Sequence, residues 1–259
     1  MRQFLVEQPQ AGRSGLARGL CAHWQWRAPS GRWKVRSALA ILTELERQGW
    51  IGLPAPQRAP VPGHRAPSAL PAERIVDGPL SQYRPLRWEL VGTTAQRREW
   101  RQLLGQHHYL GAPPLVGANL MYLAYGREGE LLGALGWHSA VQHLGCRDRL
   151  LGWNAAQRAR GLEHVVNGVR FLVMPWVKVR HLASVMLSEN LRLLQRDWPR
   201  HYGVAVWLAE SFVDRQRFSG ASYRAANWQA IGWTRGFAKR QGRFVHHGQS
   251  KEVYVYVMP

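Results

Sequence analysis

The sequence predicts a mixed α and β protein, of the α+β or α/β class, with a small helical module followed by a larger sheet-based domain. Near the N-terminus, apolar residues recur at helical spacing. After about residue 84, strand-like and helix-like runs alternate, and the segment between is dense in Pro, Ala and Arg. We therefore divide the chain into a first domain, residues 1–58, a linker, residues 59–83, and a second domain, residues 84–259.

The charge balance predicts a polyanionic partner. The chain has 259 residues and a formal net charge of +19, from 35 Lys and Arg against 16 Asp and Glu. Most of the cations are Arg, whose planar guanidinium suits phosphates and base edges. A GC-rich coding bias would inflate Arg as well, but it would not require so few acids. We therefore expect double-stranded DNA as the partner.

Several classes of protein are excluded by what the sequence lacks. Two cysteines, Cys21 and Cys146, make no CxxC pair and no disulfide framework. No apolar run approaches 18 residues, and the N-terminus has no apolar core of a signal peptide. We therefore expect a cytoplasmic protein without a membrane partner.

The first domain is predicted to hold two helices. Ser14 is placed to cap a helix over residues 15–24, and a second apolar stripe predicts a helix over residues 34–48. Gly49 follows where a positive φ is often needed, and residues 50–54 have the composition of a short strand.

The run Leu42–Ile51, LTELERQGWI, resembles the signature of winged helix-turn-helix domains. The resemblance implies that the start of the second helix lies in the major groove of DNA. A helical protein-interaction module is the alternative. The basic residues expected to contact DNA are Arg32, Lys34 and Arg36 at that helix, Arg13 and Arg18 on the preceding one, and Arg235, Lys239, Arg240 and Arg243 near the C-terminus.

The second domain is organised around residues 204–236. A strand-like run over residues 204–208 is followed by Glu210 and Asp214, just past the strand end, where ligands gather in α/β sheets. The alternative is that these carboxylates cap a helix or pair with Arg217 or Arg224, since structural ion pairs imitate sites.

Three further side chains are candidate catalytic groups. Tyr223 and Asn227 lie on a short helical segment after Glu210 and Asp214, and His108 belongs to a His-His pair with His107. Adjacent residues on an extended segment point to opposite faces, which argues against both histidines ligating one metal ion. We expect one of them to act as an acid, a base or a hydrogen-bond donor.

The element order is strand, helix, hairpin, strand, loop, long helix, strand, helix, strand, and it resembles the GNAT N-acyltransferase fold. The resemblance implies an acyl-CoA site at the turn containing Arg180, Ala183 and Ser184. Arg180 matches the family's signature, but both glycines are absent, and the Cβ of Ala183 would crowd the backbone approach to a pyrophosphate.

Residues 84–259 also resemble a narrower family, typified by DruA of the Druantia anti-phage system. The motifs that carry the resemblance are His108–Gly111, Asn167–Leu172, Leu182–Ser184, Glu210–Asp214 and Tyr223–Gly236. Ser211 and Ala221 replace threonines of the family pattern. The resemblance implies bacterial, DNA-directed work in phage defence or in mobile elements, where relatives accompany transposases.

Three functions remain open on the sequence. The first is DNA binding without catalysis, recruiting a helicase, nuclease or transposase. The second is a metal-dependent nuclease or strand-transfer enzyme in which Glu210 and Asp214, with or without Asp148, hold Mg²⁺ and His107 or His108 assists proton transfer. The third is acyl-CoA-dependent transfer to nucleic acid or protein, with Glu210 as base and Tyr223 as acid. A homodimer is compatible with each.

Overall fold

The computed structural model describes residues 12–27, 33–54, 74–113, 115, 117–240, 243–246 and 248–259, with backbone alone for Arg36, 237–240 and 243–246. The chain divides into two compact units, Met1–Pro67 and Ser68–Pro259.

The first unit contains the two helices expected from the sequence. Helix α2 spans Arg13–His23 and helix α3 spans Val35–Arg47. Their facing stripes form a small core of Leu16, Ala17, Leu20, Cys21, Ala38 and Leu42. Gly49 has φ +73°, as a residue just beyond a helix end often requires. The two helices fit the predicted winged helix.

Two local predictions in this unit are wrong. The N-cap of α2 is Gly12, and Ser14 lies in the first turn, so it is not the cap. Residues 50–54 form no strand, because Trp50–Pro54 makes no ladder with another described segment. The chain there is held through the Arg13 side chain, which donates to the Pro54 carbonyl at 2.8 Å.

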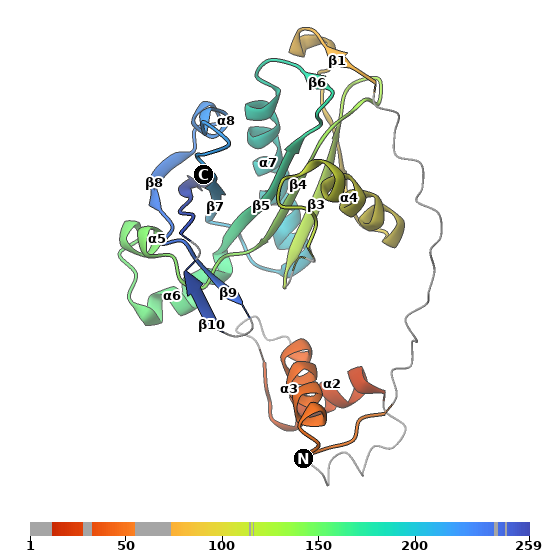
Figure 1. Cartoon of the computed structure of the whole chain (residues 1–259), viewed down its shortest axis with the longest axis vertical. Coiled ribbons are helices and arrows are strands. Elements are labelled where there is room, and N and C mark those ends of the chain that lie inside the picture. The colour runs from red at the N-terminus through yellow and green to blue at the C-terminus, as the bar shows by residue number, and fades with distance from the viewer. Residues whose placement is uncertain are drawn as a thin grey trace. The chain divides into compact units, whose positions relative to one another are not determined.

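The second unit is built on a seven-stranded mixed sheet, which confirms the predicted class (Figure 1). Its order is β2 (Arg87–Leu90), β3 (Asn119–Tyr125), β4 (Leu131–Ser139), β5 (Val165–Val173), β7 (Leu208–Val213), β11 (Glu252–Val257) and β8 (Gln229–Trp233). Only the β5–β7 pair is parallel. A hairpin of β9 (Phe237–Arg240) and β10 (Arg243–His246) forms a separate ladder.

Helices cover both faces of this sheet. On one face, α7 (Leu182–Tyr202) contributes to the main core together with β7 and β11 residues such as Ala209 and Tyr254. On the other face, α5 (Gly145–Leu150) and α6 (Ala155–Gly161) flank smaller clusters that contain Leu208 and Val255. The alternation of side chains along each strand places neighbouring residues in different cores.

Two further helices complete the unit. Helix α4 (Thr94–His107) begins with a capping box formed by Thr93 and Gln96, and α8 (Ala221–Ala225) follows β7. None of the described helices is both long and apolar enough to cross a membrane.

The sheet-based unit begins earlier than the predicted boundary at residue 84. Strand β1 (Val76–Asp77) pairs in parallel with β6 (Val177–Lys178), and Val76 and Tyr83 are buried in the main core. The described end of the expected linker is therefore part of the second unit. The rest, residues 59–73, lies outside the described residues.

Strands β5 and β7 part from each other along their length. Their parallel register runs from Val165 opposite Leu208 to Gly168 opposite Ser211. Beyond Gly168, β5 pairs only with β4, and beyond Ser211, β7 pairs only with β11. The two strands diverge toward their carboxyl ends, and this divergence positions the site.

Candidate functional site

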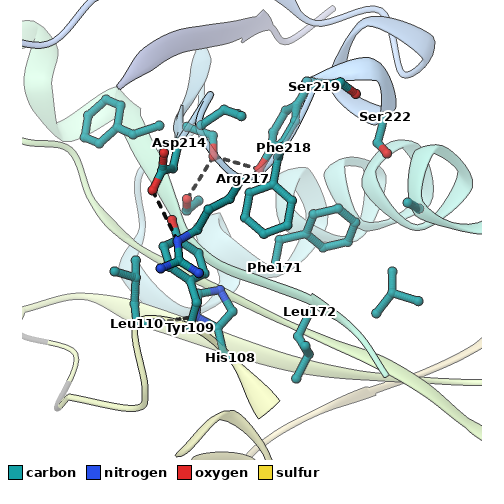
Figure 2. Close-up of a pocket in the computed structure, with 18 of the residues that line it drawn as sticks. His108, Tyr109, Leu110, Phe171, Leu172, Asp214, Arg217, Phe218, Ser219 and Ser222 are labelled. Atoms are coloured by element: carbon teal, nitrogen blue, oxygen red, sulfur yellow. Dashed lines mark hydrogen bonds and ion pairs between the residues drawn. The ribbon is translucent and has the colours of Figure 1, made fainter. Parts of the chain in front are cut away.

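A cavity of about 610 Å³ opens where β5 and β7 diverge (Figure 2). Its walls come from the ends of both strands, from the segment after α4, from the turn after β7 and from the start of α8. Among the lining residues are His108, Tyr109, Phe171, Asp214, Arg217, Phe218 and Tyr223. Pockets of this volume hold small organic ligands.

Aromatic and cationic side chains meet at the mouth of the cavity. The Arg217 guanidinium carbon lies 5.1 Å from the Tyr109 ring centroid, and Figure 2 shows this side chain reaching from Asp214 toward Tyr109. The Tyr109 and Phe218 ring centroids are 5.5 Å apart. Lys251 Nζ approaches the same Tyr109 ring at 5.8 Å.

Asp214 is the acidic group of this cavity. Its Oδ1 accepts the Gln216 backbone N–H at 3.0 Å, and its Oδ2 lies 3.6 Å from Arg217 Nε. Burial, and next the Asp214 carboxylate, raise the pKa of Tyr109. Burial lowers the pKa of Lys251, against the attraction of Asp214.

His108 lies in the cavity wall as a neutral imidazole. Burial, then the charges of Arg170 and Lys251, lower its pKa to about 4. Its Nδ1 accepts the Leu110 backbone N–H at 3.2 Å. At neutral pH it can therefore serve as a hydrogen-bonding group or a weak base, and not as an acid.

A chain of hydroxyl groups forms the floor. Ser211 Oγ lies 3.0 Å from the Gly168 carbonyl and 2.9 Å from the Tyr223 hydroxyl. The carbonyl can only accept, so Ser211 donates to it and Tyr223 donates to Ser211. Burial raises the pKa of Tyr223 to about 12. The Tyr223 hydroxyl therefore donates its proton to the hydrogen bond with Ser211, and the Tyr223 oxygen keeps a lone pair that can accept another hydrogen bond.

Glu210 lies away from this cavity, in a buried cluster on the α5 side of the sheet. Both Glu210 and Arg147 are fully buried, and Arg147 Nη1 donates to Glu210 Oε2 at 3.0 Å. Asn167 Nδ2 and the Val141 N–H donate to Glu210 Oε1 at 3.2 and 3.1 Å. Burial raises the pKa of Glu210, and these donors oppose that rise. Arg147 also binds Asp148, which pairs in turn with Arg158.

The structure does not bring Glu210 and Asp214 together as a metal site. Four residues of extended chain separate them by about 13 Å, and each carboxylate already has an arginine partner. Within the described ranges, no group of three His, Cys, Asp or Glu side chains is arranged to hold a metal ion.

Asn227 occupies a turn and not a cavity wall. It is exposed and has φ +62°, just after α8. Asn tolerates this left-handed conformation better than most residues. The structure therefore gives Asn227 a role in shaping the chain between α8 and β8.

The start of α7 is a poor match for the pyrophosphate of acyl-CoA. Ala183 lines the cavity with its Cβ where the acyltransferase signature has a glycine. Ser184 Oγ donates back to the His181 carbonyl at 2.9 Å, and Arg180 is exposed. His181 caps the helix in a left-handed conformation, φ +63°. Without the glycines, the backbone approach that this cofactor requires is obstructed.

The predicted DNA contacts fall into three groups. Arg13 forms a two-pronged ion pair with Glu46 at 2.9 and 3.0 Å, so it ties α2 to α3. Arg18 and Arg235 are exposed, and Lys34 is the half-buried N-cap residue of α3. Arg32 lies outside the described residues, and the side chains of Arg36, Lys239, Arg240 and Arg243 lie outside them as well.

The sequence did not assign three residues of this region to the site: Tyr109, Arg217 and Phe218, which line the cavity. Lys251, one of the basic residues near the C-terminus, faces Tyr109 from the chain before β11. Arg217 was considered only as an ion-pair partner. The signal was the Phe-Val-Asp-Arg-Gln-Arg-Phe run that begins in the last two residues of β7, in which a strand end is followed by Arg and Phe at a turn.

Together, the fold and the site define a mixed-sheet α+β domain with an open, partly cationic cavity between two diverging strands. The family model described as Druantia protein DruA matches residues 74–256, and the chain belongs to this family. The resemblance found in the sequence is thereby confirmed.

Solved structures with a similar chain arrangement are acetyltransferases. An Arabidopsis thaliana NAA60 complex with acetyl-CoA has 13% identity and a TM-score of 0.43, covering 67% of this chain and 98% of that one. Spermidine N-acetyltransferase from Vibrio cholerae, with CoA and spermine, has 9% identity and a TM-score of 0.43, covering 68% and 96%. At this level, what those proteins bind says nothing of this chain. No curated protein matches the sequence.

Proposed function

We propose that this DruA-family protein binds duplex DNA and acts in phage defence or in a mobile element. Membership in the DruA family is shown, and the proposal adds that the macromolecule this chain contacts is DNA. A helicase, nuclease or transposase recruited to the bound DNA would supply any catalysis.

The observation that supports the proposal is the distribution of acidic and basic side chains. Eight different acidic residues are held in ion pairs with arginine within the chain. Half of the 16 acids are thus neutralised internally, while many of the described arginines have no acidic partner. Among the described residues, the exposed arginines that join no such pair include Arg18, Arg98, Arg101, Arg149, Arg160, Arg180, Arg192, Arg200 and Arg235. A surface of this kind attracts the phosphates of nucleic acid.

The test is the salt dependence of affinity for a labelled duplex, measured by fluorescence anisotropy. Each neutralised phosphate steepens the log–log slope by about 0.9. Replacing Arg18 should weaken binding and flatten the slope by about 0.9. Arg47→Ala is the matched control, because Arg47 is also exposed but pairs with Glu44 at 2.6 Å. Binding that is indifferent to salt, or no binding at all, would refute the proposal.

A second candidate, CoA-dependent acyl transfer, is favoured by one observation: the cavity lies between diverging strands beside the start of α7. Ala183 and the commitment of the Tyr223 proton to Ser211 count against it. Glu210 cannot be its base from within the Arg147 cluster. A rise in melting temperature with acetyl-CoA would support this candidate, since a ligand of the folded state stabilises it.

Metal-dependent DNA cleavage is not proposed. It depended on Glu210 and Asp214 acting together, and their separate arginine partners keep them apart. Mg²⁺-dependent plasmid nicking that Asp214→Ala abolishes would reopen it.

A further inference from the structure

We propose that the cavity between β5 and β7 receives a single unpaired nucleotide, with its base against Tyr109 and Phe218 and its phosphate near Arg217 and Lys251. This inference rests on the proposed DNA binding and names the form of DNA that the site would recognise. A base inside a duplex is stacked and cannot enter a cavity, so the nucleotide must be unpaired or turned out of the helix.

The exposed apolar side chains at the mouth are the first observation. Tyr109, Leu110 and Phe218 are 36%, 42% and 51% exposed, and all three line the cavity. Exposed apolar residues that gather at one place mark a binding site more often than scattered ones do. Two of them are aromatic rings 5.5 Å apart, and every base presents a flat face for stacking on such rings.

The charge at the mouth is the second observation. Arg217 and Lys251 both approach the Tyr109 ring, at 5.1 and 5.8 Å. Buried Arg170 adds a third positive charge close enough to lower the pKa of Lys251 and His108. Asp214 is the acid that opposes them, and it is engaged by Arg217. The balance at the mouth is therefore positive, which suits a phosphate.

The floor of the cavity contains polar groups that can form hydrogen bonds with the edge of a base. The Tyr223 oxygen can accept a hydrogen bond, because its own proton goes to Ser211. Beneath it lies a void of about 10 Å³ that shares Gly168, Phe171, Ser211 and Tyr223 with the cavity. Trp228 lines this void, and its buried Nε1–H has no partner among the described residues. An apolar wall with a few polar groups at its base is the usual form of a small-molecule site.

The experiment compares two DNA probes that have the same base pairs and differ by one extra nucleotide. One is a perfect duplex and the other carries one extrahelical 2-aminopurine, whose fluorescence reports stacking. The wild-type full-length protein is expected to bind the bulged probe more tightly and to change its fluorescence. The Tyr109→Ala, Phe218→Ala double variant should lose about 5- to 150-fold in affinity for the bulged probe, the range for one stacked base, and keep its affinity for the duplex.

Two further variants serve as controls for the double variant. Tyr109→Phe keeps the ring and should retain binding of the bulged probe. Trp233→Ala removes a ring that is 52% exposed but does not line the cavity, and it should have no effect. Melting curves identify any variant that fails to fold, in which case Arg217→Ala, on an exposed turn, replaces it and should weaken binding of the bulged probe more than binding of the duplex.

The outcomes separate this inference from the proposed function. Equal wild-type affinity for both probes, or an unchanged bulge preference in a folded double variant, overturns the nucleotide site and leaves duplex binding standing. Loss of binding to both probes by wild-type protein overturns both.

Discussion

The two carboxylates of the β7 segment lie in opposite surroundings. Glu210 is fully buried and binds a fully buried arginine, whereas Asp214 lies at an open mouth with an arginine whose side chain is 59% exposed. Residues four apart would share a face if the strand continued. Strand β7 ends at Val213, however, and Asp214 turns the chain by accepting the backbone N–H groups of Arg217 and Phe218 through its carbonyl.

The difference shows that burial of the partner, more than proximity to a strand end, decides what an acid does. The buried ion pair of Glu210 and Arg147 offers little to a ligand, because both side chains are shielded from solvent and the carboxylate already accepts from three donors. An exposed pair contributes little to stability and can exchange its partner for a ligand. On this comparison, Glu210 holds the fold together and Asp214 belongs to the site.

The largest expected effect follows from removing the buried acid. Glu210→Ala removes the buried acid that pairs with Arg147 and leaves that buried guanidinium with Asp148 as its remaining acidic partner, which should cost about 3–5 kcal/mol of unfolding free energy. Urea denaturation followed by circular dichroism measures it. Asp214→Ala is the matched control and should cost less than about 1 kcal/mol.

The same comparison can be sharpened with a double variant. Replacing Arg147 by Met and Glu210 by Leu removes both charges, so it should cost less than Glu210→Ala alone. Equal losses for Glu210→Ala and Asp214→Ala would contradict the division of roles between the two acids.

A smaller loss is expected from the cavity wall. Gly220 has φ +71°, and a Cβ there would meet the Tyr254 hydroxyl group, which hydrogen-bonds Glu252 and Arg224. Gly220→Ala should therefore cost about 1–3 kcal/mol. Gly203→Ala is the control at φ +72°, where a Cβ meets open space, and its smaller loss should reflect the backbone alone. Similar losses in the two variants would count against a tightly packed wall.

The next largest effect is expected from removing the contacts of Arg13 in the first unit. Arg13 binds Glu46 and the Pro54 carbonyl, so Arg13→Ala should destabilise α2 by roughly 1 kcal/mol. Faster hydrogen exchange of the α2 amides in the full-length protein would measure this loss. Arg18→Ala, on the same helix and exposed, should leave exchange unchanged while weakening DNA binding. The reverse pattern would restore Arg13 as the phosphate contact.

The smallest effect concerns His108 and pH. Because its folded pKa is lowered to about 4 from 6.5, the unfolded chain takes up a proton first as pH falls. The stability that this histidine contributes is complete above about pH 6.5 and is lost as the pH falls toward 4. His108→Asn should flatten the pH dependence of the urea midpoint in that window. An identical pH profile in the variant would place His108 in solvent.

The elements that could be predicted from the sequence are those with local periodicity. The stripe that includes Leu39 and Leu42 predicted α3, and the apolar runs predicted most strands of the sheet. The strand predicted over residues 204–208 was placed too early, because β7 spans Leu208–Val213 and Glu210 lies within it and not past its end. The pairing of Arg147 with Glu210 could not be predicted, because 63 residues separate them and only the packing of α5 on the sheet joins them. Tyr109 and Lys251 likewise meet only in the folded chain.

Hydrogen–deuterium exchange of the full-length protein, with and without the bulged DNA, tests the division between the two carboxylates most directly. Slower exchange is predicted in peptides covering residues 107–111 and 214–223, with no change in residues 206–210 around Glu210. Protection confined to residues 206–210, or absent from both cavity segments while the DNA is bound, would contradict the account.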